Sequence, residues 1–181
     1  MQTRCALVGM PGSGKSTVGR HLARRLGLPF VDLDQQLEQQ LGCSIRAYFE
    51  QHGEAAFRER EAQALAELAR QDGPMVLSTG GGAVLGEANR AALRQGFAVM
   101  YLRASPEDIF RRVKHDTKRP LLQVPDPLGR LRELYQARDP LYREAAHYVM
   151  ECSRPSVHGL VSTIAMQLEM AQGGPEAQPS P

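Results

Sequence analysis

Short apolar runs alternate with longer amphipathic stretches along this chain. An uninterrupted apolar run is typical of a strand that is buried on both faces of a parallel sheet. On this pattern we expect strands at 5–8, 29–32, 75–78, 97–102 and 148–151. The intervening stretches carry apolar residues at helical spacing. Val18, Leu22 and Leu26, for example, share one helix face until Gly27 supplies a stop.

Helix start and stop signals divide the intervening stretches. Ser44 and Ser105 are expected N-caps, and Pro106 follows at the first helical position. We expect helices at about 15–26, 33–41, 44–52, 54–70, 87–95, 105–113, 128–138, 141–146 and 156–170. The alternation of strands and helices predicts an α/β protein whose parallel sheet is covered on both faces.

The remaining segments and the length complete the domain prediction. The prolines and charges of 114–127 predict a mobile surface loop, and the glycines and prolines of 173–181 predict a disordered tail. With 181 residues in all, we expect a single domain over 1–172. No internal repeat interrupts it.

Composition and charge argue against several classes of protein. With 42% apolar and 23% charged residues the chain resembles an average soluble protein, and 22 Lys and Arg against 20 Asp and Glu do not predict a nucleic-acid partner. Three cysteines are too few for a disulfide framework, which favours a reducing compartment. No apolar run approaches the roughly 20 residues of a membrane span, so we expect a cytoplasmic protein with no membrane contact.

A glycine-rich loop carries the strongest chemical signal. The eight residues from Gly9 to Ser16 match GxxxxGK[ST], directly after an expected strand and directly before an expected helix. Backbone N–H groups of such a loop can surround phosphate oxygens, while the lysine reaches the β and γ phosphates. The alternative, a glycine turn with a solvated lysine, would not explain why a strand, this loop and a helix follow one another in that order. We therefore expect ATP to be bound by Gly12, Ser13, Gly14, Lys15, Ser16 and Thr17.

Two absences narrow the class of nucleotide-binding protein. Switch GTPases carry an Asn-Lys-x-Asp element, which does not occur here. Motor ATPases normally have an acidic residue at the end of an apolar strand, whereas the third strand ends in Ser78-Thr79-Gly80. Both absences favour a small-molecule kinase.

Two carboxylates follow the second strand, at the sheet edge where ligands bind in open parallel sheets. Asp32 could lie near Mg²⁺, and Asp34 could orient an acceptor hydroxyl and take its proton. The alternative is that both acids simply favour a helix N-terminus through its dipole.

Further polar and glycine positions suggest an acceptor site, each with an ordinary structural alternative. Arg58 could bind an anion or lie on a solvated helix face, and the glycines at 80–82 could approach a ligand or form a flexible loop. Arg119, within the expected mobile segment, could close over phosphates. Arg138 could bind the acceptor or favour a helix C-terminus, since its helix is expected to end there.

Taken together, these segments resemble the shikimate kinases over about residues 6–156. The resemblance rests on an ordered set of motifs rather than on the phosphate loop alone. The motifs are GMPGSGKSTVG at 9–19, FVDLD at 30–34, GEAAFR at 53–58, GGGAV at 80–84, KRPLL at 118–122 and RDPLY at 138–142.

The resemblance implies a fold and a reaction. The fold is a P-loop, nucleoside-monophosphate-kinase-like three-layer α/β fold with a five-stranded parallel sheet and helices on both faces. The reaction is transfer of the ATP γ-phosphoryl group to the 3-hydroxyl of shikimate, with Mg²⁺, in aromatic amino-acid biosynthesis. It also implies a substrate-binding region at about 33–61 and a lid at about 114–125.

The resemblance also implies roles for individual residues. Shikimate would be held by Asp34, Arg58, Arg138 and the backbone of Gly80, Gly81 and Gly82. Ser16 would ligate Mg²⁺ with Asp32 nearby, and Arg112 and Pro155 would flank adenine. The groups expected to act in transfer are Lys15, Asp34 and Arg119.

Two rival functions remain at this point. A gluconate kinase would share the phosphate loop without needing the acceptor motifs together, and a nucleotide-binding module without transfer activity would leave those motifs unused. We expect shikimate and ATP as small-molecule partners of a monomer.

Overall fold

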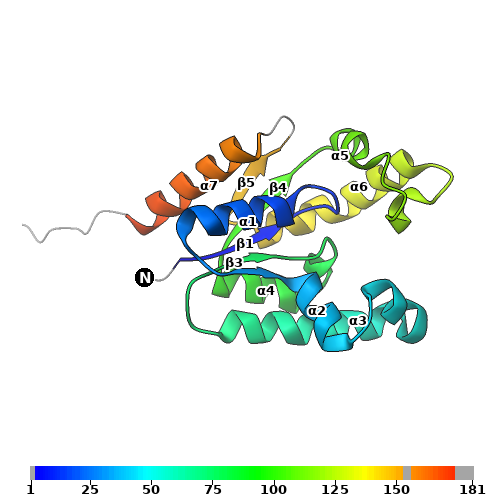
Figure 1. The fold of residues 1–181 in the computed structure, drawn as a ribbon, viewed down its shortest axis with the longest axis horizontal. Coiled ribbons are helices and arrows are strands. Elements are labelled where there is room, and N and C mark those ends of the chain that lie inside the picture. The colour runs from blue at the N-terminus through cyan, green and yellow to red at the C-terminus, as the bar shows by residue number, and fades with distance from the viewer. Residues whose placement is uncertain (1–2, 153–155, 174–181) are drawn as a thin grey trace, which may run out of the picture.

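A computed structural model describes residues 3–152 and 156–173 of the chain. Its centre is a single sheet in the order β2-β3-β1-β4-β5, with every neighbouring pair parallel (Figure 1). The strands lie within one residue of the predicted positions. They are β1 (Arg4–Val8), β2 (Phe30–Asp32), β3 (Met75–Ser78), β4 (Ala98–Arg103) and β5 (Tyr148–Glu151).

Helices cover both faces of this sheet, as predicted. The helices α1 and α7 pack against each other on one face, whereas α4 contacts α3 and α6 on the other (Figure 1). The elements are α1 (Lys15–Leu26), α2 (Leu33–Leu41), α3 (Ile45–Arg70), α4 (Glu87–Gly96), α5 (Pro106–Val113), α6 (Pro127–Ala145) and α7 (Val157–Gln172), with 3₁₀ turns η1 (Ala83–Leu85) and η2 (Pro120–Leu122).

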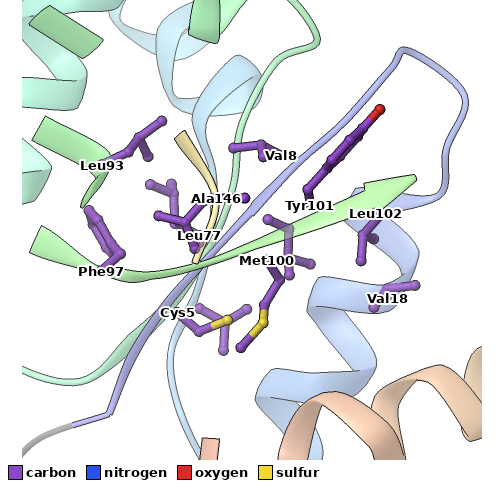
Figure 2. Packing of buried hydrophobic residues seen from close by; sticks show 14 of the residues in the cluster. Cys5, Val8, Val18, Leu77, Leu93, Phe97, Met100, Tyr101, Leu102 and Ala146 are labelled. Atoms are coloured by element: carbon purple, nitrogen blue, oxygen red, sulfur yellow. The ribbon is translucent and has the colours of Figure 1, made fainter. Parts of the chain in front are cut away.

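The core lies between the sheet and these two helix layers. Strand residues such as Cys5, Leu77 and Met100 are buried, together with Val18 of α1 and Leu93 of α4 (Figure 2). Burying one side chain of leucine size contributes roughly 1.5–3 kcal/mol, so the continuous apolar runs of the sequence stabilise the centre of the sheet. The loops at the strand ends are thereby held on a rigid base.

Local signals place the helix ends where they were predicted. The Ser44 hydroxyl accepts a hydrogen bond from the Ala47 amide at 3.1 Å, and the Ser105 hydroxyl accepts one from the Asp108 amide at 3.1 Å. Gly53 has φ 82° and ψ 169°, values that no helix contains. The predicted separation of 44–52 from 54–70 is therefore confirmed, although the two helices follow one another directly as α3.

One helix prediction is wrong. The sequence suggested two helices, 128–138 and 141–146, with Arg138 ending the first, but α6 runs without interruption through Pro140. Proline removes the N–H that would bond the carbonyl of Gln136. Both Pro140 and Gln136 are exposed, so water can solvate that carbonyl. Arg138 consequently lies inside a helix and not at its C-terminus.

The segment at 114–127, predicted to be a loop, contains one short turn, η2. Pro155 and residues 174–181, for which an adenine contact and a disordered tail were predicted, lie outside the described residues. Within the described ranges, no helix combines the length and the apolarity that crossing a membrane requires.

Candidate active site

Three loops meet at the carboxyl ends of β1, β2 and β3, which are neighbours in the sheet. They are the phosphate loop after β1, the two aspartates at the end of β2 and the glycines after β3. Between them lies a cavity of about 400 Å³. Its lining includes Pro11, Gly12, Gly14, Lys15, Ser16, Thr17, Asp32, Asp34, Gln35, Thr79, Gly80, Gly81 and Arg119.

The phosphate loop leads directly into α1. Gly14 precedes the helix with φ 92°, and no side chain in the described part of the chain caps the first turn, which also lacks acidic residues. The amide groups of that turn and the positive end of the helix dipole therefore remain available to an anion. Ser13 is buried and does not line the cavity.

Lys15 is a buried cation on the cavity wall. Its Nζ donates hydrogen bonds to the carbonyl oxygens of Gly9, at 2.8 Å, and Met10, at 3.0 Å. Burial lowers the pKa of Lys15 to about 8, although the negative charge of Asp34 opposes the effect. An anion such as a phosphate in the cavity would favour the charged ammonium.

Asp32 joins the phosphate loop to β2. Its Oδ2 accepts a hydrogen bond from the Ser16 hydroxyl at 2.8 Å, and its Oδ1 accepts one from the Gln35 amide at 3.2 Å as the N-cap of α2. The helix N-terminus interpretation of Asp32 is therefore confirmed, and its role near Mg²⁺ stays a prediction. A hydroxyl beside a carboxylate suits a hard cation such as Mg²⁺, which usually takes few protein ligands and completes its shell with phosphates and water. No group of three or more His, Cys, Asp or Glu able to hold a metal gathers in the described ranges.

Asp34 lies in the first turn of α2, where an acid favours the helix dipole, and it also lines the cavity. Burial raises its pKa above the usual value for an aspartate, the negative charge of Asp32 raises it further, and Lys15 opposes the change. The carboxylate lies so close to Gly80 that a Cβ there would be 2.7 Å from Oδ1. Asp34 therefore lies between the phosphate loop and the glycines, where an acceptor hydroxyl could reach it.

Each of the three glycines meets a different functional neighbour. A Cβ on Gly81 would be 2.6 Å from Cδ of Pro11, and one on Gly82 would overlap the Arg58 guanidinium. In the described part of the chain the amide N–H groups of Gly80, Gly81 and Gly82 have no acceptor, although Gly80 and Gly82 are buried. Gly80 and Gly81 line the cavity, where a ligand could accept hydrogen bonds from these amides, which favours close approach of a ligand over the flexible-loop alternative.

Arg58 is held by an acid that the sequence analysis missed. Its Nη1 donates to Oε1 of Glu61 at 2.9 Å, and Glu61 is only 1% exposed. The guanidinium also lies 5.3 Å from the ring centre of Phe57. Glu61 follows Arg58 by three positions on the same helix face, a spacing that could have indicated the pair. Arg58 is therefore a fixed group rather than part of a solvated face.

Arg58 and Arg138 lie outside the cavity lining, but their charges act on it. Burial raises the pKa of Asp34, and the charge of Arg58 opposes this rise. Burial lowers the pKa of Lys15, and the charge of Arg138 lowers it further. Arg138 also opposes the rise in the pKa of Tyr142. The Arg58 guanidinium lies against Gly82, and Arg138 precedes by one turn the Tyr142 hydroxyl that contacts Gly81, so both arginines lie near the glycine loop, which fits an acceptor that carries an anionic group.

The two remaining arginines lie beside the phosphate loop. Nε of Arg119 donates to Oδ2 of Asp116 at 2.9 Å, while its side chain lines the cavity and remains 42% exposed. Arg112 donates from Nη2 to the Cys152 carbonyl at 2.5 Å and from Nη1 to the Ser13 carbonyl at 3.4 Å. Arg119 is thus available at the mouth of the cavity, whereas Arg112 joins the phosphate loop to the end of β5.

A phosphate loop that faces a carboxylate, arginines and free glycine amides on a parallel sheet defines a P-loop kinase for a small polar acceptor. The family model for shikimate kinase matches residues 11–169. The chain belongs to the shikimate kinase family.

Relatives agree with this assignment. The shikimate kinase of Paracidovorax citrulli is 59% identical over 91% of both chains, and that of Burkholderia pseudomallei is 54% identical over 91% of this chain and 89% of its own. The solved shikimate kinase of Acinetobacter baumannii in complex with shikimate is 43% identical, with a TM-score of 0.87 over 96% of both chains. A gluconokinase from Sinorhizobium meliloti, 19% identical with a TM-score of 0.55 over 95% of this chain and 98% of its own, shares the fold alone.

Proposed function

We propose that this chain transfers the γ-phosphoryl group of ATP to the 3-hydroxyl of shikimate, giving 3-phosphoshikimate and ADP in aromatic amino-acid biosynthesis. The observation that carries the proposal is the single cavity in which Lys15 and the phosphate loop face Asp34 and the glycine loop. The names of the relatives and the shikimate held by the Acinetobacter baumannii enzyme support the choice of acceptor.

On the nucleotide side, the backbone amides of residues 12–17 and Lys15 would bind the phosphates. Ser16 and Asp32, hydrogen-bonded at 2.8 Å, would hold Mg²⁺, which supplies positive charge to the phosphate oxygens when bound. Arg112 would lie against the adenine, since it already contacts the phosphate loop through the Ser13 carbonyl.

On the acceptor side, Arg58 and Arg138 would bind the shikimate carboxylate, and the amides of the glycine loop would bind oxygens of the same molecule. Asp34 would orient the 3-hydroxyl and accept its proton. Its raised pKa makes it a stronger base than an exposed aspartate. Because Glu61 fixes Arg58, the acceptor would bind to a site that is largely formed in advance.

The segment 114–125 would act as a lid. Closure would exclude water, which could otherwise accept the phosphoryl group, and would bring Arg119 to the charge that develops on the γ-phosphoryl oxygens. Arg119 already lines the cavity, so a small change at its bond to Asp116 would free the guanidinium for a phosphate.

An assay of ADP release over a panel of hydroxylated acids tests the proposal. Wild-type protein with MgATP should turn over shikimate and not gluconate, and Lys15→Ala should abolish turnover while remaining folded. Arg130→Ala is a matched control, because it removes an exposed cation whose ion pair is with Glu133. Preference for gluconate would indicate the other kinase, and absence of ADP release with every acceptor would indicate a nucleotide-binding module.

A further inference from the structure

A buried tyrosine that none of the proposed steps uses joins α6 to the glycine loop. The Tyr142 hydroxyl donates a hydrogen bond of 2.5 Å to the carbonyl oxygen of Gly81, 61 positions away in the sequence. The tyrosine is fully buried, so its hydroxyl is not shared with bulk water. A short hydrogen bond in a buried environment restrains both partners strongly.

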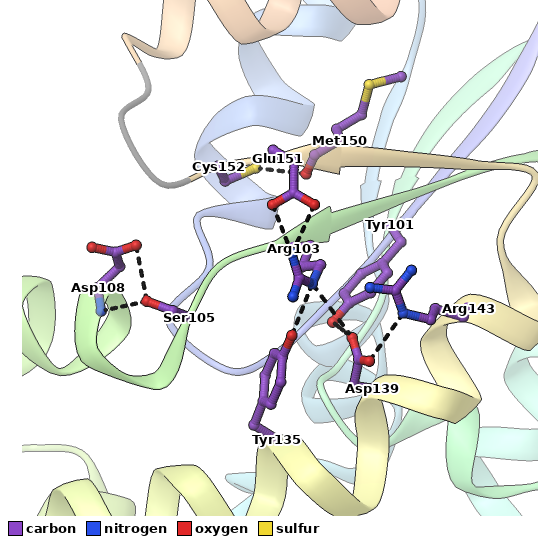
Figure 3. Close-up of polar contacts among 10 residues, drawn as sticks. All are labelled: Tyr101, Arg103, Ser105, Asp108, Tyr135, Asp139, Arg143, Met150, Glu151 and Cys152. Atoms are coloured by element: carbon purple, nitrogen blue, oxygen red, sulfur yellow. Dashed lines mark hydrogen bonds and ion pairs between the residues drawn. The ribbon is translucent and has the colours of Figure 1, made fainter.

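The helix that carries Tyr142 is itself fixed to the sheet. The Tyr101 hydroxyl of β4 donates to Oδ1 of Asp139 at 2.6 Å, and Oδ2 of the same carboxylate accepts from Nε of Arg143 at 3.0 Å (Figure 3). The rings of Tyr101 and Tyr142 lie 5.0 Å apart. Nε of Arg103, also of β4, donates to the Tyr135 hydroxyl of α6 at 2.8 Å, so the base from which Tyr142 extends does not depend on the Tyr101 hydroxyl alone.

Gly81 lies between this hydroxyl and the phosphate loop. Its carbonyl oxygen contacts Tyr142, and the Cβ position on its α carbon is occupied by the ring of Pro11. Three consecutive glycines have the freest backbone of any tripeptide, and a contact that fixes one peptide plane removes much of that freedom. Because C=O and N–H of a trans peptide point in opposite directions, fixing the Gly81 carbonyl also fixes the direction of the Gly82 amide.

Arg138 lies one turn before Tyr142 on the same helix and near the same phenol. Burial raises the pKa of Tyr142 to about 12, and the positive charge of Arg138 opposes this rise. The phenol thus stands at the junction of two groups proposed to hold the acceptor, Arg138 and the glycine loop.

We infer that Tyr142 is a positioning residue, whose hydroxyl fixes the Gly80–Gly82 loop against α6 and so sets the acceptor-binding groups at a constant distance from the phosphate loop. The inference rests on the proposed function for its kinetic consequence. A displacement of about 1 Å between reactants can lower a rate by about 100-fold, so a loop that is free to shift would reduce turnover of the acceptor without changing how ATP is bound.

The test compares Tyr142→Phe with Tyr101→Phe. Each change removes one hydroxyl from a fully buried tyrosine and breaks one short hydrogen bond, but only the Tyr142 hydroxyl contacts the glycine loop. For Tyr142→Phe we expect kcat/KM for shikimate to fall by about 10- to 100-fold, with KM for ATP within about twofold of wild type. For Tyr101→Phe we expect both constants to stay near wild type despite a similar fall in melting temperature.

A second measurement separates this inference from the proposed function. In ¹⁵N relaxation experiments, Tyr142→Phe should lower the backbone order parameters of Gly80–Gly82, and Tyr101→Phe should not. If the wild-type protein does not turn over shikimate, the proposed function is wrong, but the order parameters still decide whether Tyr142 restrains the loop. The inference is overturned by unchanged order parameters, by equal kinetic losses in both variants, or by loss of fold in Tyr142→Phe alone.

Discussion

Gly80→Ala should separate activity from stability, because the added methyl group meets a functional carboxylate. A Cβ at this position would be 2.7 Å from Oδ1 of Asp34, whereas ordinary contacts begin at about 3.4 Å. The carboxylate must therefore shift by about 0.7 Å. Asp34 is the residue proposed to orient the acceptor hydroxyl, so the shift falls on the reacting geometry.

The expected magnitudes differ for the two properties. Gly80 does not have positive φ, so alanine adopts its backbone conformation without strain. Loss of backbone freedom in the unfolded chain then stabilises the variant by about 0.4–1 kcal/mol, which offsets the cost of moving one short side chain. A displacement approaching 1 Å at the reacting groups should lower kcat by roughly 10- to 100-fold.

Gly86→Ala is the matched control. Gly86 has φ −83°, and the nearest side-chain atom to a Cβ there, Nδ2 of Asn89, would be 3.5 Å away. Steady-state ADP release and thermal melting should show normal turnover in this control, and a large loss of kcat with a nearly unchanged melting temperature in Gly80→Ala. A kcat of Gly80→Ala within twofold of wild type, or a loss of activity that follows a loss of fold, would refute the reasoning.

Three further changes test other parts of the molecule. Asp34→Asn should lower kcat by at least about 100-fold with ATP affinity preserved, and an equal loss of ATP affinity would move Asp34 to the metal side. Arg119→Ala should lower kcat far more than shikimate affinity measured by calorimetry without nucleotide, and normal turnover would remove this arginine from the mechanism. Nδ1 of His147 accepts the Val99 amide at 3.0 Å, and burial and Arg94 lower its pKa below 6.5. The neutral imidazole therefore stabilises the fold above pH 6.5, and this stabilisation is lost as the pH falls below that value. The urea midpoint of unfolding should fall between about pH 7.5 and 5.5 by less in His147→Gln than in wild type. An equal fall in both proteins would contradict the assignment.

Most of the fold could be predicted because its signals are local. The apolar run that forms β1, the cap at Ser44 and the stop at Gly53 act through neighbours within a few residues. The path of α6 through Pro140 could not be predicted in this way. The contacts that hold this helix, from Tyr101 to Asp139 and from Tyr142 to Gly81, come from segments 38 and 61 positions away.

The same distinction applies to the candidate site. The cluster around Lys15 and Ser16 was evident because a phosphate loop works through consecutive backbone amides, which require a fixed local sequence. Glu61 and Tyr142 bind no substrate in the proposed mechanism and belong to no such pattern. Their importance comes from the groups that they hold, Arg58 and Gly81, which only the folded chain brings to them.

The glycine loop explains why these distant contacts converge. Gly80 leaves room for Asp34, Gly81 for Pro11 and Gly82 for Arg58, so each missing side chain admits one group from a different segment. A loop with side chains would push the aspartate, the phosphate loop and the arginine apart. Since phosphoryl transfer depends on positioning more than on covalent chemistry, the three glycines permit the close approach and the Tyr142 hydrogen bond limits the freedom that they introduce. The loop therefore needs both the missing side chains, which let the three groups approach, and the Tyr142 hydrogen bond, which keeps its backbone in place.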